Sequence, residues 1–173
     1  MTKLLVTLDF DGVISPIDKQ RDFEAEEAWK VLKLGAFPCA IAEETLELLN
    51  ELAEVNSKNP AIEVVWATSW EDLTEHFSEQ SQGIIPDFRW ISTRPSKAES
   101  IYGEAQKLGA DAILSCEDSG SVHRELSKLL NPRVKGDPTT IIRVEPTTER
   151  GLEADHLATI RWAVSSFGRK RNY

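Results

Sequence analysis

The sequence predicts a single α/β domain built on a doubly wound parallel sheet of about five strands, with helices on both faces. Three observations predict this fold class. Short apolar segments alternate with amphipathic segments along the chain, which is typical of parallel strands joined by helices. Two apolar segments end directly in acidic residues, at the position where α/β proteins place their ligands. The 173 residues, 40% of them hydrophobic, are enough for one buried core.

We expect the domain to span residues 1–168, followed by a short basic tail over residues 169–173. The tail contains Arg169, Lys170 and Arg171. A charged terminal segment of this kind is usually solvated, and a phosphate-binding tail is the alternative.

Five segments have the composition of buried or half-buried strands, with apolar and β-branched residues in short runs. They are residues 3–8, 61–68, 88–92, 111–119 and 139–146. The first is the most apolar, and it stops at two aspartates one residue apart, which predicts a strand that ends in a functional loop.

The segments between the strands carry apolar residues at helical spacing. They are residues 21–32, 40–55, 71–80, 96–109, 121–130 and 151–167. In the fourth segment Ser96 is the expected N-cap and Gly109 the expected stop, and Asn131-Pro132 is expected to end the fifth.

Four polar signals follow the expected strands or open a helix. They are Asp9-Phe10-Asp11-Gly12 after the first strand, Thr68-Ser69 after the second, Lys97 at a helix start and Glu117-Asp118 after a later strand. Taken singly, each has an ordinary interpretation as a turn, a cap, a solvated lysine or compensation of a helix dipole. The carboxyl ends of parallel strands meet at one edge of a sheet, so the four signals together predict a site at that edge.

The two aspartates at positions 9 and 11 are close in sequence, so their negative charges would repel each other. Two carboxylates about 4 Å apart repel by roughly 4 kcal/mol at an effective dielectric constant near 20. A cation, a proton or water would relieve this repulsion. Mg²⁺ is suited to the site because it prefers oxygen ligands and is often held by one or two carboxylates plus a phosphate. A protonated Asp11 would also be poised as a general acid.

The stretches "DFDGV", "VVWATS", "SK" and "CEDS" together resemble the motifs of the haloacid dehalogenase superfamily of phosphohydrolases, over about the first 125 residues. The resemblance implies that Asp9 is the nucleophile and forms an aspartyl-phosphate. It implies that Asp11 protonates the leaving oxygen and later activates water. Family dehalogenases lack the second aspartate, so Asp11 favours phosphate ester chemistry over carbon-halogen cleavage.

The same resemblance gives roles to the other motifs. Thr68 is expected to donate a hydrogen bond to the phosphoryl oxygens, with Ser69 beside it. Lys97 is expected to balance the charge of the intermediate, and Gly12 to allow the chain to turn sharply beside the phosphate. The implied cofactor is Mg²⁺, and its expected ligands are the acidic side chains Asp9, Asp11, Glu117 and Asp118.

Some assignments stay open. The commoner family pattern has a second acid three or four residues after the first, whereas here Ser119-Gly120-Ser121 follows, so either Glu117 or Asp118 is the expected metal contact. Lys107 is the alternative to Lys97. The connections between the motifs are short, so we expect the specificity cap of this superfamily to be absent or minimal.

The stretches "WATSW" and "GLEADHLATIRW" bear a weaker resemblance to the haloacid dehalogenase-like domains of RNA-repair proteins. Trp66, Trp70 and Trp90 lie near the second motif, where they either pack in the core or stack on a substrate ring. The net charge of −9 and the isoelectric point near 4.9 argue against strong binding of nucleic acid, which depends on basic side chains.

We therefore expect a Mg²⁺-dependent phosphomonoesterase whose substrate is a phosphorylated small molecule or a phosphorylated macromolecular end. A phosphotransferase with the same intermediate and a non-catalytic binding or regulatory protein are the alternatives. No apolar run approaches the ~18 residues of a membrane helix. The isolated cysteines Cys39 and Cys116 and the lack of an export signal indicate the cytoplasm. The sequence does not indicate an oligomeric state.

Overall fold

The computed structural model describes residues 2–18, 22–130, 138 and 140–168. Its main sheet has five parallel strands. In order across the sheet they are β5 (Arg89–Trp90), β4 (Ile62–Trp66), β1 (Leu4–Leu8), β6 (Ala112–Cys116) and β7 (Thr140–Val144). The predicted doubly wound α/β fold is confirmed, and each predicted strand segment contains one of these strands.

Strand β1 occupies the centre of the sheet and is buried along its whole length. It pairs with β4 on one side and with β6 on the other, Leu8 lying beside Trp66 and Cys116. The chain therefore changes direction across the sheet on either side of β1, and the carboxyl end of such a strand is the usual ligand site of an open α/β sheet.

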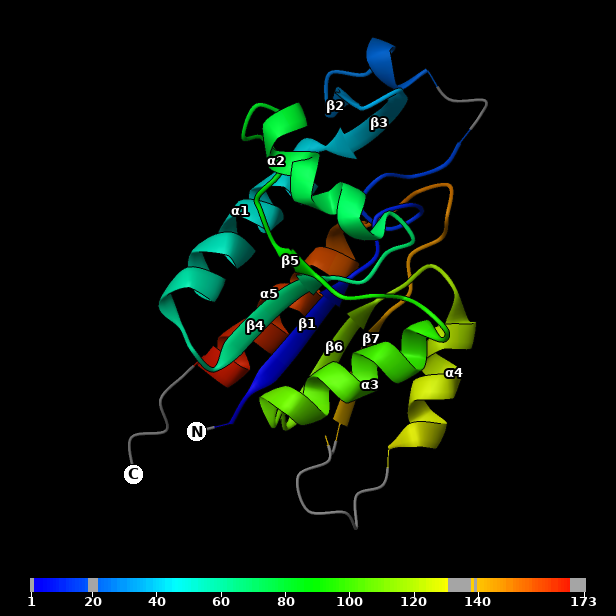
Figure 1. The fold of residues 1–173 in the computed structure, drawn as a ribbon. Helices are drawn as coiled ribbons and strands as arrows, with labels where there is room; N and C mark the ends of the chain where they lie inside the picture. Colours follow the sequence, from blue (N-terminus) through cyan, green and yellow to red (C-terminus); the bar gives the residue numbers. More distant parts are fainter. Residues whose placement is uncertain (1, 19–21, 131–137, 139, 169–173) are drawn as a thin grey trace.

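Helices cover both faces of the sheet (Figure 1). One face is covered by α1 (Glu43–Lys58) and α5 (Ala154–Gly168), the other by α3 (Lys97–Leu108) and α4 (Gly120–Leu129). The predicted caps of α3 are confirmed, since the Ser96 hydroxyl accepts from the N–H of Glu99 and Gly109 ends the helix with a φ of 64°.

A β-hairpin lies between β1 and α1, and the prediction of a helix over 21–32 is wrong in its described part. A short 3₁₀ turn, η1 (Phe23–Ala25), is followed by β2 (Trp29–Leu34), which pairs antiparallel with β3 (Phe37–Ala42). The last residues of β2 are alternately buried and exposed, the two-residue period of a strand. Gly35, at a φ of 61°, provides the left-handed conformation in the two-residue loop between the strands.

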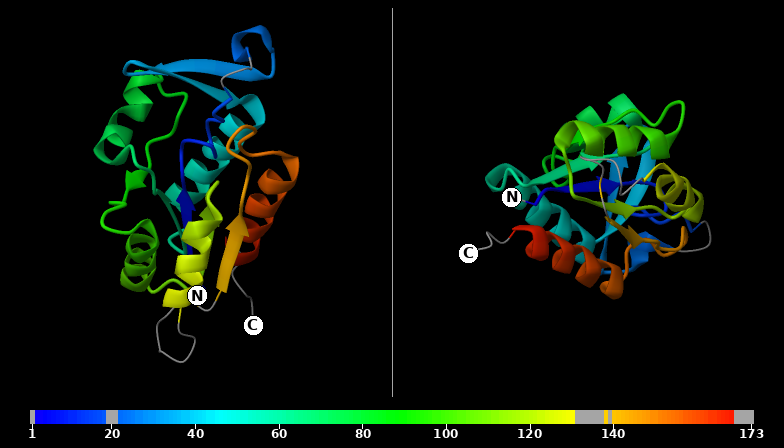
Figure 2. Two further views of the ribbon diagram at one scale, coloured as in Figure 1. Left: turned by 90° about the vertical axis from the view of Figure 1, so that its right-hand side faces the viewer. Right: turned by 90° about the horizontal axis from the view of Figure 1, so that it is seen from below.

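The hairpin lies above the carboxyl end of the main sheet, where β2 packs against α2 (Phe77–Gln80) (Figures 1 and 2). The helix predicted over 71–80 is divided into the 3₁₀ segment η2 (Glu71–His76) and α2. The hairpin is a small insertion, as the short connection from Gly12 to Thr68 predicted. The helix predicted over 40–55 begins only at Glu43.

Two predictions fall on residues outside the described part of the chain. These are the end of α4 at Asn131-Pro132 and the basic tail over residues 169–173. Among the helices that the structure describes, none combines the length and apolar character needed to cross a membrane.

Candidate active site

The loop after β1 is a tight turn that fixes Asp9 and Asp11. The N–H of Phe10 donates to Oδ1 of Asp9 (2.8 Å), and the N–H of Ser15 donates to the carbonyl of Phe10 (2.9 Å). The Phe10 ring is fully buried and packs against the ring of Phe77, with ring centroids 4.7 Å apart. Burial of this aromatic side chain, which lies between Asp9 and Asp11 in the sequence, anchors the loop to the core.

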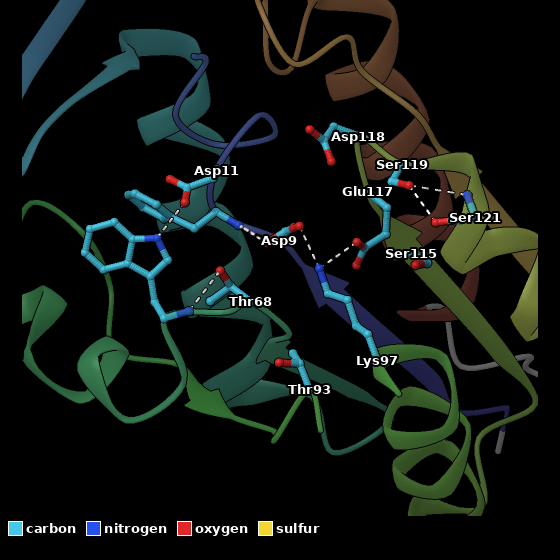
Figure 3. Close-up of polar contacts among 12 residues, drawn as sticks. Asp9, Asp11, Thr68, Thr93, Lys97, Ser115, Glu117, Asp118, Ser119 and Ser121 are labelled. Carbon is cyan, nitrogen blue, oxygen red and sulfur yellow. Dashed lines mark hydrogen bonds and ion pairs between the residues drawn. The ribbon is translucent and has the colours of Figure 1, made fainter. Parts of the chain in front are cut away.

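Lys97 joins the first and last motifs across the sheet edge. Its Nζ donates to Oδ2 of Asp9 and to Oε2 of Glu117, both at 2.6 Å (Figure 3). Lys97 is the first residue of α3, where the helix dipole opposes a positive charge, so the two carboxylates have to compensate. Burial lowers the pKa of Lys97, but the charges of Glu117 and Asp9 outweigh it and the net shift is upward, so the ammonium form is retained.

Glu117 is a buried partner of Lys97. Its side chain is 1% exposed, and Oε1 has no hydrogen-bond partner in the described residues. Burial raises the pKa of Glu117 to about 8; the Asp9 charge contributes to the rise, and Lys97 opposes it. Both Asp9 and Glu117 therefore hold Lys97 in place, and the single ammonium group of Lys97 interacts with two carboxyl groups.

Asp11 points away from Lys97 and receives a hydrogen bond from an aromatic residue. The indole Nε1 of Trp70 donates to Oδ2 of Asp11 at 2.9 Å (Figure 3). Burial raises the pKa of Asp11 above its usual range, and the charges of Asp9 and Asp118 raise it further, against the effects of Trp70 and Lys97. A carboxyl group with a raised pKa is suited to act as a proton donor near neutral pH.

Thr68 lies at the end of β4 and is 1% exposed. Its Oγ1 accepts a long hydrogen bond from the N–H of Trp70 (3.5 Å), and a hydroxyl that accepts one hydrogen bond can still donate another. Ser69 is exposed beside it. In the turn that follows, Glu71 has a φ of 43°. The Glu71 carboxylate accepts a hydrogen bond from the N–H of Thr93, which joins this turn to the loop before Lys97.

Asp118 is held by a residue from a distant loop. The hydroxyl of Thr148 donates to its Oδ2 at 2.7 Å. The same carboxylate lies over Gly12, where an added Cβ would come within 2.2 Å of Oδ2, and Gly12 has a φ of 75°. Glycine is therefore required at this position both by the backbone conformation and by the approach of Asp118.

The donor set fits a hard divalent cation whose remaining ligands are water and a phosphate. Within the described ranges, no cluster of three or more His, Cys, Asp or Glu side chains forms a metal site by itself. Mg²⁺ needs fewer, because it keeps several waters and binds one or two carboxylates together with substrate phosphate. Asp9, Asp11 and Asp118 are close enough for their charges to interact, and Figure 3 shows their carboxylates around one space. Glu117 points instead to Lys97, so Asp118 is the better candidate ligand of the acidic pair.

The structure thus brings the sequence-predicted residues together at one end of β1, β4 and β6, although their chemical roles stay predictions. Lys107, the alternative lysine, lies in the last turn of α3, is 78% exposed and pairs with Glu104. Trp70 and Thr148 were not predicted as site residues. Trp70 was considered only for packing or stacking, and Thr148 lies in a polar stretch with no motif that would have singled it out.

A cleft of about 740 Å³ opens beside Asp11, between the loop after β1, the hairpin and η2. Ser69 and Trp70, which follow β4, line it together with Phe37 and Cys39 of β3. The hairpin therefore forms a wall of the candidate site.

No protein-family model matches the chain, and no curated protein sequence does. Among solved structures, the chain is similar to the effector Ceg4 of Legionella pneumophila, with 12% identity, 94% of each chain covered and a TM-score of 0.50. At this identity the similarity shows the fold alone. This chain therefore has a doubly wound α/β fold with a polar, acidic site at the carboxyl end of its central strand.

Proposed function

We propose that this protein is a haloacid dehalogenase-like phosphohydrolase that cleaves phosphate monoesters through an aspartyl-phosphate on Asp9 and depends on Mg²⁺. The observation that carries the proposal is the ion pair of Lys97 with Asp9 and Glu117, beside Asp11 and Asp118, at the end of the central strand. The order of the motifs along the chain and the oxygen-rich donor set support it.

In the first step, a carboxylate oxygen of Asp9 attacks the phosphorus atom, and the bond between phosphorus and the leaving oxygen breaks. Asp11 gives its proton to the leaving oxygen, which departs as an alcohol. The raised pKa of Asp11 favours the protonated form that this step needs. The Lys97 ammonium offsets negative charge beside Asp9 as the phosphoryl group arrives.

In the second step, a water molecule attacks the phosphorus atom of the aspartyl-phosphate. Asp11, now a carboxylate, takes a proton from this water, and the bond to Asp9 breaks. Inorganic phosphate leaves, and both aspartates return to their starting states. The Thr68 hydroxyl would donate a hydrogen bond to a phosphoryl oxygen during both steps.

Asp9 and Asp118 are the side chains that would hold Mg²⁺, with Asp11 next to them. When bound, the ion would neutralise charge on the phosphoryl oxygens, which a carboxylate nucleophile cannot approach unaided. Thr148 and Gly12 keep the carboxylate of Asp118 in position. Glu117 serves a different purpose, because it fixes the Lys97 ammonium at 2.6 Å.

The proposal is tested with acetyl phosphate and 4-nitrophenyl phosphate as substrates, in the presence of Mg²⁺ and of a chelator. We expect Asp9→Asn to lower kcat by roughly 1000-fold or more, and Asp11→Asn to lower it strongly while the fold is retained. Asp87→Asn, at an exposed position before β5, is the matched control and should keep wild-type activity.

Full activity of Asp9→Asn, or turnover that is unaffected by the chelator, would overturn the proposal. A phosphotransferase would show the same dependence on Asp9, but phosphate would appear on an added alcohol in place of free phosphate. A folded protein that is inactive on every phosphate ester and yet binds phosphate would point to a binding protein.

A further inference from the structure

We propose that the cleft beside Asp11 binds the leaving group of the substrate, and that this leaving group is an aromatic alcohol. This inference rests on the proposed function, since it assigns the substrate class of the same site. The wall formed by the hairpin, the exposed apolar side chains in the cleft and the position of Trp70 carry it.

The first observation is where the exposed apolar side chains gather. Four large hydrophobic residues are exposed in the described part of the chain: Ile17, Phe37, Leu73 and Trp162. Three of them, Ile17, Phe37 and Leu73, line this one cleft. Exposed apolar residues that cluster in a hollow are typical of a binding surface, whereas scattered ones need no explanation.

The second observation is that the cleft is continuous with the candidate general acid. Asp11 lines the cleft, and Trp70 both lines it and donates to Oδ2 of Asp11 at 2.9 Å. A general acid must reach the leaving oxygen, so the rest of the leaving group has to extend into the space beside it. The cleft is a hollow that Asp11 itself lines, so it can take the rest of the leaving group.

The third observation is the aromatic character of its walls. The Trp70 ring meets that of Phe37 edge to face, with centroids 5.6 Å apart, although the two residues come from different elements. Phe37 is 60% exposed, so one side of its ring is left without a protein neighbour. An aromatic ring entering the cleft would gain edge-to-face contacts with both of these side chains.

The experiment compares kcat/KM for acetyl phosphate, phenyl phosphate and 2-naphthyl phosphate, all with Mg²⁺. The two aryl esters release phenols of similar acidity, so a difference between them reports contacts with the ring and not the chemistry of bond breaking. We expect kcat/KM for the naphthyl ester to exceed that for the phenyl ester by about tenfold or more.

Phe37→Ser and Leu73→Ser test the contacts. Both side chains are more than half exposed, so the fold should tolerate these changes. Each should lower kcat/KM for the naphthyl ester by about fivefold or more and should lower it by a smaller factor for acetyl phosphate, which carries no ring. Trp162→Ser removes an equally exposed aromatic residue from α5, outside the cleft, and should change neither.

The outcomes separate the two proposals. If acetyl phosphate is hydrolysed through Asp9 but the aryl esters show no ring-size preference, or the Phe37 and Leu73 variants behave like Trp162→Ser, the leaving-group assignment is overturned and the proposed function stands. If none of the three compounds is hydrolysed, or Asp9→Asn remains active, the proposed function itself fails and this inference with it.

Discussion

The ammonium nitrogen of Lys97 lies 2.6 Å from a carboxylate oxygen of Glu117, a side chain that is only 1% exposed. This pair joins the first residue of α3 to the loop after β6, and the third member, Asp9, follows β1. The electrostatic balance of the site therefore depends on the packing of three elements. The two carboxyl groups explain why a lysine is tolerated at the N-terminus of a helix, where the helix dipole disfavours a positive charge.

Lys97→Met should lower the free energy of unfolding by about 3 to 5 kcal/mol, because it leaves a buried carboxyl group without its cation. The double variant with Glu117→Gln should recover part of this loss. Urea denaturation followed by circular dichroism measures both. Lys107→Met, on the same helix but 78% exposed, is the control and should cost less than about 0.5 kcal/mol. Equal losses for the two lysine variants would contradict the stabilising role of the pair.

Gly12→Ala should be more destabilising than Gly35→Ala. Both glycines have a left-handed φ, 75° and 61°, so both variants carry the same backbone strain of about 1 kcal/mol. Only at Gly12 would the new Cβ meet another group, at 2.2 Å from Oδ2 of Asp118, whereas Gly35 has no atom within 4 Å. Thermal unfolding and phosphatase assays of the two variants make the comparison. Gly12→Ala should also lose activity, and a fully active Gly12→Ala protein would show that the position of Asp118 is unimportant.

Thr148→Val should weaken the binding of Mg²⁺ by Asp118. The substitution removes the hydroxyl that donates to Oδ2 of Asp118 at 2.7 Å while keeping the size of the side chain. Removing such an outer contact commonly lowers metal affinity by about 10- to 100-fold. We expect the Mg²⁺ concentration for half-maximal activity to rise by about tenfold, with Thr148→Ser, which keeps the hydroxyl, close to wild type. An unchanged Mg²⁺ requirement in Thr148→Val would argue against Asp118 as a ligand.

Cys39 should react slowly with iodoacetamide near neutral pH, although it lines the cleft. Burial raises the pKa of its thiol to about 11, and the charge of Asp11 contributes. The thiolate is the reactive form, so at pH 8 the rate should be roughly 100-fold below that of an ordinary cysteine and should rise with pH up to about 11.

Asp11→Asn removes one cause of this shift, so it should lower the pKa of Cys39 and speed its alkylation at pH 8. Peptide mass mapping distinguishes Cys39 from the fully buried Cys116, and unfolded protein, in which both react quickly, is the reference. Rapid labelling of Cys39 in the folded wild type would contradict the assigned environment.

Much of the fold was predictable because its signals are local. The strands are short apolar runs, and α3 has a capping serine and a terminating glycine next to it in the sequence. The hairpin over 29–42 was not predicted, because the acidic and apolar residues before it have a spacing that a helix also satisfies. The two-residue alternation of β2 favours a strand over a helix only because β3 pairs with it, and that pairing is not visible in the local sequence.

The candidate site was predictable to the same extent. Asp9, Asp11 and Glu117 directly follow apolar strands, and parallel strands bring their carboxyl ends to one edge, so convergence follows from the order of the elements. By itself, then, the sequence determined the doubly wound sheet and the convergence of Asp9, Asp11 and Glu117 at its edge.

Only the tertiary structure decided which of these groups pair. It directed Glu117 to Lys97 and Asp118 to Thr148, 30 residues away, and it placed Trp70 on Asp11 across 59 residues. The physical reason is that a hydrogen bond between distant residues depends on the packing of whole elements, and no local period or cap records that packing. The cleft, too, exists only because the hairpin folds over the end of the sheet.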